Sequence, residues 1–237
     1  MTYYCFICHA PYSPVVSWQH VLTLKNLDIL CEKCRRALLC ISGETCESCG
    51  RPFQHLDSSY RQGPLCTDCI RWQEDEDWKG VLTKNRSVYL YNDFMKEVVS
   101  LWKFRGDYAI VNVFQEDFSR EFFRHFDDTF LIVPIPLSAE RLYERGFNQA
   151  KALAELLNLP IHDILTRHHH EKQSKKSRRE RLQTENLFQL AEQICLTNRR
   201  IVLIDDIYTT GTTLRHAAKL LREAGAKVIC SFTLVRS

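Results

Sequence analysis

The amino-acid sequence predicts an α/β protein in which a small cysteine-rich module precedes a doubly wound parallel sheet. Three observations lead to this prediction. Nine of the eleven cysteines lie in residues 1–72, a segment with few long apolar periodicities. From about residue 85 onward, apolar runs of strand length alternate with helix-like patterns. Residues 73–84 are rich in acidic side chains, so we expect a linker there and a second domain at 85–237.

Eight of the cysteines form four CxxC pairs. Two thiolates at this spacing can share one tetrahedral Zn²⁺ ion with a second pair further along the chain. Paired in chain order, they give two Cys₄ zinc sites, one from Cys5, Cys8, Cys31 and Cys34 and one from Cys46, Cys49, Cys66 and Cys69. A cross-braced pairing, the first pair with the third and the second with the fourth, stays open.

Zinc explains these pairs better than disulfides or a redox role. The chain opens without a basic start and an apolar leader, so we expect a cytoplasmic protein, in which thiols stay reduced. Because residues 1–72 cannot build a large core, we expect structural zinc to stabilise them by about 10–16 kcal/mol per site. No apolar run approaches the roughly eighteen residues of a membrane span, so none is predicted.

The strands of the second domain are predicted from apolar runs. FLIVPI at 130–135, IVLI at 201–204 and KVICSFTLV at 227–235 are nearly continuous, as expected of parallel strands buried on both faces. A short strand at 87–91 precedes them, and 161–165 is a further candidate.

Helices are predicted where apolar residues recur every three or four positions. The predicted helices are 93–104, 108–126 with Asp107 as its cap, 147–157, and 212–224 ended by Gly225. A loop with Arg141 and Arg145 connects the strand at 130–135 to the helix at 147–157. In a sheet of this kind, ligands bind at the carboxyl ends of the strands.

Residues 201–213, IVLIDDIYTTGTT, have the residue types of a site for a phosphate and for vicinal hydroxyls. Asp205 and Asp206 follow a buried strand and can only accept hydrogen bonds, which suits vicinal hydroxyls or a hydrated Mg²⁺. The loop after them precedes a helix, whose first backbone amides and positive dipole end favour a phosphate. The loop residues are Thr209, Thr210, Gly211, Thr212 and Thr213. A plain strand, turn and capped helix would need only one such polar residue.

This run resembles the binding signature of type I phosphoribosyltransferases. The resemblance implies that Asp205 and Asp206 hold the ribose hydroxyls of phosphoribosyl pyrophosphate (PRPP) with Mg²⁺ and act as the catalytic pair. It also implies that the loop at 209–213 cradles the 5′-phosphate of PRPP.

Three further segments are WKFRGDY at 102–108, VPIPLSAERLYERGFNQAKALAE from residue 133, and the basic stretch 167–181. Together with the cysteine pairs they resemble the ComF family of late competence proteins over essentially the whole chain. The most family-specific part is RLYERGFNQ at 141–149. The resemblance implies a pyrophosphate loop with Leu137 and Ser138, helped by Arg141 or Arg145, and a lid at 167–186.

ComF proteins are linked to the uptake of transforming single-stranded DNA and to a competence helicase-like ATPase. The charge pattern agrees with two different contacts. The whole chain carries only +3, and the first 80 residues are neutral to acidic, which suits docking of a protein. The segment 167–181 holds seven Lys or Arg and two Glu, which suits single-stranded DNA, although a solvated surface loop has the same composition.

Three hypotheses about function follow. The first is a competence accessory protein that binds PRPP and single-stranded DNA and docks on the ATPase, which would recruit it to the inner face of the membrane. The second is an active phosphoribosyltransferase acting on a base or amine, with Tyr208 as a clamp for the acceptor. The third is a zinc-ribbon adaptor with a relic domain. The intact IDDIYTTGTT favours the first two, and the lack of an acceptor constellation favours the first.

Overall fold

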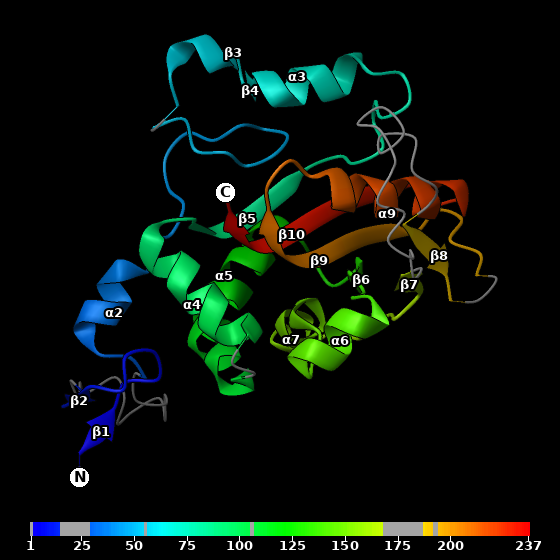
Figure 1. Cartoon of the computed structure of the whole chain (residues 1–237). Helices are drawn as coiled ribbons and strands as arrows, with labels where there is room; N and C mark the ends of the chain where they lie inside the picture. The colour runs from blue at the N-terminus through cyan, green and yellow to red at the C-terminus, as the bar shows by residue number, and fades with distance from the viewer. Residues whose placement is uncertain (1, 15–28, 55, 105–106, 168–186, 192–193) are drawn as a thin grey trace, which may run out of the picture.

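A computed structural model describes residues 2–14, 29–54, 56–104, 107–167, 187–191 and 194–237 (Figure 1). A four-stranded parallel sheet lies at the centre, with the strand order β5-β10-β9-β6. The strands are β5 (Asn85–Leu90), β6 (Leu131–Pro134), β9 (Arg200–Tyr208) and β10 (Val228–Arg236). All four overlap the predicted strands, and the predicted parallel α/β sheet is confirmed.

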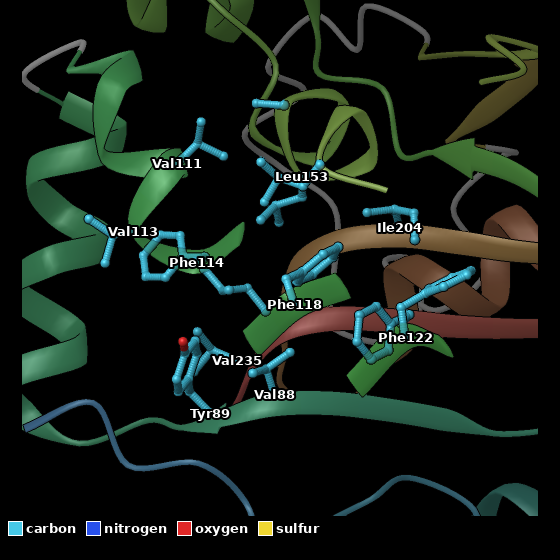
Figure 2. Packing of buried hydrophobic residues seen from close by; sticks show 14 of the residues in the cluster. Val88, Tyr89, Val111, Val113, Phe114, Phe118, Phe122, Leu153, Ile204 and Val235 are labelled. Atoms are coloured by element: carbon cyan, nitrogen blue, oxygen red, sulfur yellow. The ribbon is translucent and has the colours of Figure 1, made fainter. Parts of the chain in front are cut away.

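One face of the sheet is covered by the helices between β5 and β6 and by the second of the two helices that follow β6. They are α4 (Asp93–Phe104), the 3₁₀ helix η2 (Tyr108–Phe114), α5 (Gln115–His125) and α7 (Gln149–Glu155). Figure 2 shows how apolar side chains of η2, α5 and α7 meet those of β5, β9 and β10. The rings of Phe118 and Phe122 lie with their centroids 4.7 and 5.5 Å from that of Phe232 on β10. We call this cluster the first core.

The opposite face is covered by α9 (Thr212–Glu223). Its buried residues Leu214, Ala217, Ala218 and Leu221 recur at helical spacing and pack on Leu203 and its neighbours in β9. We call this cluster the second core. Helices therefore lie on both faces, as the predicted doubly wound fold requires. The chain leaves α9 through Gly225, whose φ of +99° is the left-handed conformation that favours glycine.

The predicted single helix at 108–126 is wrong in its first half. Residues Tyr108–Phe114 form the 3₁₀ helix η2, and α5 begins only at Gln115. The buried residues of η2 are spaced by three, Ile110 with Val113 and Val111 with Phe114. A repeat of three residues per turn keeps both pairs on the first core, which explains the tighter helix. Asp107 makes no side-chain cap.

The predicted loop around Arg141 and Arg145 is also wrong, because these residues lie in a helix, α6 (Ala139–Arg145). The Ser138 hydroxyl accepts a hydrogen bond from the Arg141 amide at 3.3 Å and caps its start. Gly146 ends it with a φ of +78°. The helix predicted at 147–157 is shorter, since α7 spans Gln149–Glu155.

The candidate strand at 161–165 is found only at its ends: Ile161 makes a single parallel bridge with Ile132 of β6, and Leu165 begins the next strand. The chain then forms β7 (Leu165–Arg167), which pairs antiparallel with β8 (Phe188–Leu190) as a separate two-stranded sheet. The segment between these strands lies outside the described residues, apart from Leu187.

The cysteine-rich region consists of two modules, which Figure 1 shows well apart. The first contains β1 (Tyr3–Tyr4), β2 (Pro11–Tyr12) and α2 (Glu32–Ala37). The second contains the 3₁₀ helix η1 (Ser58–Tyr60), β3 (Arg61–Gln62), β4 (Leu65–Cys66) and α3 (Thr67–Glu74). Cys5, Cys31 and Cys34 of the first module pack in the first core, and all four paired cysteines of the second module lie in the second core.

The segment predicted as a linker packs against the sheet domain. Val81 and Leu82 are buried in the second core, and the Thr83 amide donates to the Ile229 carbonyl at 2.8 Å. Residues 81–83 therefore pack continuously with the sheet domain, and the domain boundary at 84–85 stays a prediction. Within the part of the chain that is described, no helix has the length and apolar character to cross a membrane.

Candidate functional site

The site begins where two neighbouring strands differ in length. β6 pairs with β9 only as far as Pro134 opposite Ile204, whereas β9 continues beside β10 until Tyr208 meets Arg236. Asp205 and Asp206 therefore lie on a strand that has lost its neighbour on one side. A cavity of about 180 Å³ opens there, at the carboxyl edge of the sheet, as expected for this fold.

The cavity has a strongly polar lining. Its charged residues are the two carboxylates of Asp205 and Asp206 and four cations, Lys103, Arg141, Arg145 and Arg167. Asn148, Gln149 and Thr213 add polar groups, and Leu137 adds an apolar wall. The excess of cations over carboxylates suits a ligand with several negative charges.

The two aspartates have different surroundings. Burial and the neighbouring Asp206 raise the pKa of Asp205 to about 7, while Lys103 and Arg167 oppose this shift. Lys103 forms an ion pair with Asp206. The Asp206 amide donates to Asp205 Oδ1 at 2.9 Å. The remaining carboxylate oxygens can accept hydrogen bonds from hydroxyls or ligate a hydrated Mg²⁺ ion.

The guanidinium groups converge from two elements. α6 presents Arg141 and Arg145, and β7 ends on Arg167. Burial and the nearby charge of Arg141 lower the pKa of Arg167, while Asp205 opposes this. Two cations held so close together are stabilised by an anion between them, and guanidinium forks bind phosphate oxygens in pairs.

Asn148 and Gln149 are site residues that the sequence analysis did not assign. The Asn148 side chain accepts from the amides of Ala150 and Lys151 and caps α7, while its Nδ2 donates to the Ile135 carbonyl at 3.0 Å. Gln149 is 99% buried and accepts from Arg145 Nη1 at 2.9 Å. Its Nε2 has no partner among the described residues, so it is a free donor at the cavity. Both lie in the family-specific segment 141–149, and this position was the feature of the sequence that could have identified them as site residues.

The Thr and Gly loop leads from β9 into α9. Gly211 has a φ of +79° and precedes α9 without a side chain that could cap it. The Thr212 amide makes only a long hydrogen bond of 3.4 Å to the Thr210 hydroxyl, so the start of the helix can still bind an anion. Thr210 and Thr212 share a hydroxyl hydrogen bond of 2.8 Å. Thr209 and Thr210 are exposed, and Thr213 faces the cavity. This is the geometry of an anion site at a helix N-terminus.

Tyr208 lies beneath this loop and does not face an acceptor. Its side chain is 2% exposed, and its hydroxyl accepts from Arg215 Nη1 at 2.9 Å. A Cβ atom on Gly211 would lie 2.2 Å from the Tyr208 hydroxyl, so the loop closes directly over the ring. This burial excludes the interpretation of Tyr208 as a clamp for a base.

The remaining predicted site residues are placed as follows. Leu137 lines the cavity, and Ser138 caps α6 beside it. Of the basic segment 167–181, only Arg167 is described, so the predicted DNA contact and the lid at 167–186 otherwise lie outside the described residues.

The cysteine thiols gather into two clusters that follow the order of the chain. The Sγ atoms of each set lie within 4.8 Å of one another, and Cys8 to Cys31 and Cys49 to Cys66 are both 3.7 Å apart. Four sulfurs about 2.3 Å from one tetrahedral Zn²⁺ ion are separated by about 3.8 Å. Both sets therefore fit zinc, and the cross-braced pairing is excluded.

Comparison with known proteins agrees with this geometry. Residues 142–237 match the family model of the phosphoribosyl transferase domain. The competence protein ComFC of Bacillus subtilis is 46% identical over 235 residues, covering 98% of this chain and 95% of that protein. The competence protein ComFC of Streptococcus pneumoniae is 35% identical over 233 residues, covering 98% and 99%.

More distant similarities extend to other proteins. The DNA utilization protein YhgH of Escherichia coli is 25% identical over 245 residues, covering 98% of this chain and 96% of that protein. A hypoxanthine phosphoribosyltransferase structure from Staphylococcus aureus covers 55% of this chain and 65% of that chain at 13% identity and a TM-score of 0.35. That last similarity is too low to carry an argument.

Proposed function

Because this chain belongs to the family of ComFC competence proteins, we propose that it acts in the uptake or processing of transforming single-stranded DNA and binds PRPP at the cavity beside β9. The observation that carries the proposal is the juxtaposition of two carboxylates, four cations and an uncapped helix N-terminus around one cavity.

Each part of PRPP has a matching group. The ribose hydroxyls can donate to Asp205 and Asp206. The 5′-phosphate suits the amides of the loop at 209–213, where the dipole of α9 favours negative charge. The diphosphate suits the guanidinium groups on α6 and β7, and Mg²⁺ would neutralise part of its charge.

A second candidate function is catalysis of phosphoribosyl transfer to a base or amine. Phe104 gives specific support, since its ring is 73% exposed at the end of α4 and the Arg145 guanidinium lies 5.8 Å from its centroid. An exposed ring beside a cavity-lining arginine offers an acceptor base a stacking surface. Release of pyrophosphate from PRPP, with single-stranded DNA or free bases as acceptors, would distinguish a transferase from a binding protein.

We further propose that the zinc modules dock the competence ATPase and that the basic segment 167–181 contacts single-stranded DNA. The first module supports the docking proposal, because Tyr3, Tyr4 and Phe6 are 36%, 62% and 38% exposed there. Exposed aromatic side chains in a module that is close to neutral once its four thiolates hold Zn²⁺ suit a protein partner better than a phosphate backbone.

The test of the ligand site is calorimetric titration of the zinc-loaded chain with PRPP and Mg²⁺. We expect saturable binding in the micromolar range, about −8 kcal/mol. The double variant Asp205→Ala and Asp206→Ala should lose this binding, because the ribose and Mg²⁺ lose their oxygen ligands.

The matched control is Asp127→Ala with Asp128→Ala, a second pair of consecutive aspartates, which is exposed and lies before β6. It should bind PRPP as the unaltered chain does. Equal affinity in both double variants would contradict the assignment of the site.

A further inference from the structure

A buried arginine connects the second cysteine cluster to the loop at 209–213. Arg236, the last residue of β10, is 4% exposed. Its Nη2 donates to Cys49 Sγ at 3.5 Å, and its Nη1 donates to the carbonyls of Tyr208 and Thr209, both at 3.1 Å. One guanidinium therefore contacts a zinc-ligand sulfur and the backbone of the loop at the same time.

A second buried arginine makes a parallel connection. Arg215 on α9 is 2% exposed, and its Nη1 donates to the Tyr208 hydroxyl and approaches the Thr210 carbonyl at 3.5 Å. Its guanidinium carbon lies 4.3 Å from the ring centroid of Trp72. Trp72 belongs to α3, the helix that carries Cys69 of the second cluster.

These contacts orient the loop as well as attach it. In a planar trans peptide, the carbonyl and the next amide point in opposite directions. Because the carbonyls of Tyr208, Thr209 and Thr210 are held toward Arg236 and Arg215, the amides of the three following residues turn away from these two guanidinium groups. Amides presented in this way are the donors that an anion needs.

We propose that the second zinc site, through Arg236 and Arg215, positions the 5′-phosphate loop, so that PRPP affinity depends on zinc at Cys46, Cys49, Cys66 and Cys69. This inference rests on the proposed function. A zinc ion with four thiolates carries a net charge near −2, which attracts and fixes the Arg236 guanidinium. Without the ion, the knuckle that holds Cys49 loses its constraint and both arginines lose their anchors.

The first zinc site serves as a control within the same chain, because it lies on the other core of the sheet domain. Cys5 and Cys34 pack in the first core with α4 and α5, whereas the second cluster packs in the second core with Tyr208 and α9. Within the described part of the chain, no hydrogen bond or ring contact of the Arg236 or Arg215 guanidinium reaches the first module. Loss of the first zinc ion should therefore leave the phosphate loop as it was.

The first experiment measures PRPP affinity in the full-length chain and three variants, with the zinc content of each determined. Arg236→Met keeps all eight ligand cysteines and should weaken PRPP binding about 5- to 100-fold, the range of typical coupling between sites. Arg236→Lys should recover little of this loss, because one ammonium cannot serve both the sulfur and the two carbonyls. Arg222→Met, at an exposed position of α9, is the control and should bind normally.

The second experiment follows hydrogen exchange in the peptide that covers residues 208–215, with no ligand present. Arg236→Met and Cys49→Ser should both accelerate exchange there, whereas Cys8→Ser in the first cluster should not. Unchanged exchange and unchanged affinity in Arg236→Met would overturn the inference. Faster exchange in a chain that binds no PRPP would uphold the coupling and refute the proposed ligand.

Discussion

Asp205 illustrates the energetic cost of a binding residue. Its carboxylate lies beside a second carboxylate in a largely desolvated position, and its pKa rises to about 7 for that reason. An isolated acid in an unfolded chain has a pKa of about 3.9. Above about pH 7 the folded chain therefore carries a charge on Asp205 that burial disfavours, a pattern expected where a ligand and its Mg²⁺ complete the surroundings.

The first prediction concerns the pH dependence of stability. Between about pH 4 and pH 7 the folded state holds more protons than the unfolded state at Asp205, so its contribution to the free energy of unfolding falls as the pH rises. Asp205→Asn removes this titration. We expect it to be more stable than the unaltered chain by about 1–2 kcal/mol at pH 8, and no more stable at pH 4.

Urea unfolding between pH 4 and pH 8 measures this effect, with Asp128→Asn at an exposed position as the control. The same series should show PRPP binding that strengthens from pH 6 to pH 8 in the unaltered chain and is absent in Asp205→Asn. If the unfolding free energies of Asp205→Asn and of the unaltered chain changed in parallel with pH, the raised pKa of Asp205 would be refuted.

At the scale of elements, the turn between β9 and α9 tolerates no side chain at its glycine. Gly211 has a φ of +79°, and a Cβ there would lie 2.2 Å from the Tyr208 hydroxyl and 2.4 Å from Arg215 Nη1. Gly146 after α6 has a φ of +78° but open space around it. A side chain at Gly146 would meet only the backbone strain of a positive φ, whereas a side chain at Gly211 would also collide with its neighbours.

We therefore predict different outcomes for two alanine substitutions. Gly146→Ala should cost about 1 kcal/mol of unfolding free energy, the conformational penalty alone. Gly211→Ala should cost about 2–4 kcal/mol and weaken PRPP binding more than about tenfold, because the Tyr208 ring and its bond to Arg215 must move. Denaturant unfolding and calorimetry would measure both. Similar effects of the two substitutions would contradict this prediction and show that the loop at 209–213 can shift to accommodate a Cβ atom.

The sequence predicted the elements whose patterns are continuous. The apolar runs of β6, β9 and β10 and the periodicity of α4 and α9 placed those elements within a few residues. It failed where competing patterns overlap. At 108–114 the apolar residues are spaced by three, and this 3₁₀ helix was predicted as part of a longer α-helix. At 139–145 the apolar side chains of Leu142 and Tyr143 are exposed, so α6 has no apolar face from which a helix could be predicted.

The site was predictable as far as its residues are contiguous in sequence. Asp205, Asp206 and the Thr and Gly loop form one motif, and the cysteine pairs have a recognisable spacing. Lys103 and Arg167 reach the same cavity from α4 and β7, and only the tertiary fold brings them there. The buried roles of Arg215 and Arg236 were hidden because arginines in a sequence usually indicate exposed surface.

At the scale of the whole molecule, Asn85 joins the second cysteine module to the sheet. It is fully buried at the start of β5, its Nδ2 donates to the Cys49 carbonyl at 3.1 Å, and its Oδ1 accepts from the Ser231 hydroxyl at 2.9 Å. Its side chain therefore satisfies polar groups from the turn that holds Cys49 and from β10, which are far apart in sequence.

The corresponding prediction is that Asn85→Ala costs about 2–4 kcal/mol of unfolding free energy, because a buried carbonyl and a buried hydroxyl both lose their partner. Asn112→Ala, at an exposed position of η2, should change stability by less than about 0.5 kcal/mol. Equilibrium unfolding in urea measures both. A loss below about 1 kcal/mol for Asn85→Ala would mean that water replaces its hydrogen bonds.

The pairing of β5 with β10 also sets the order in which the chain can fold. β5 has no other sheet neighbour among the described strands, and its contacts with β10, such as Ser87 with Thr233, span 146 positions. Such distant pairing forms slowly, and during synthesis it must await the last strand. The four cysteines from Cys46 to Cys69 are synthesised long before β10, and in the folded chain the Ser48 carbonyl accepts from the Asn85 amide at 2.7 Å. Early zinc capture would therefore hold the first strand of the sheet in place until its partner emerges from the ribosome.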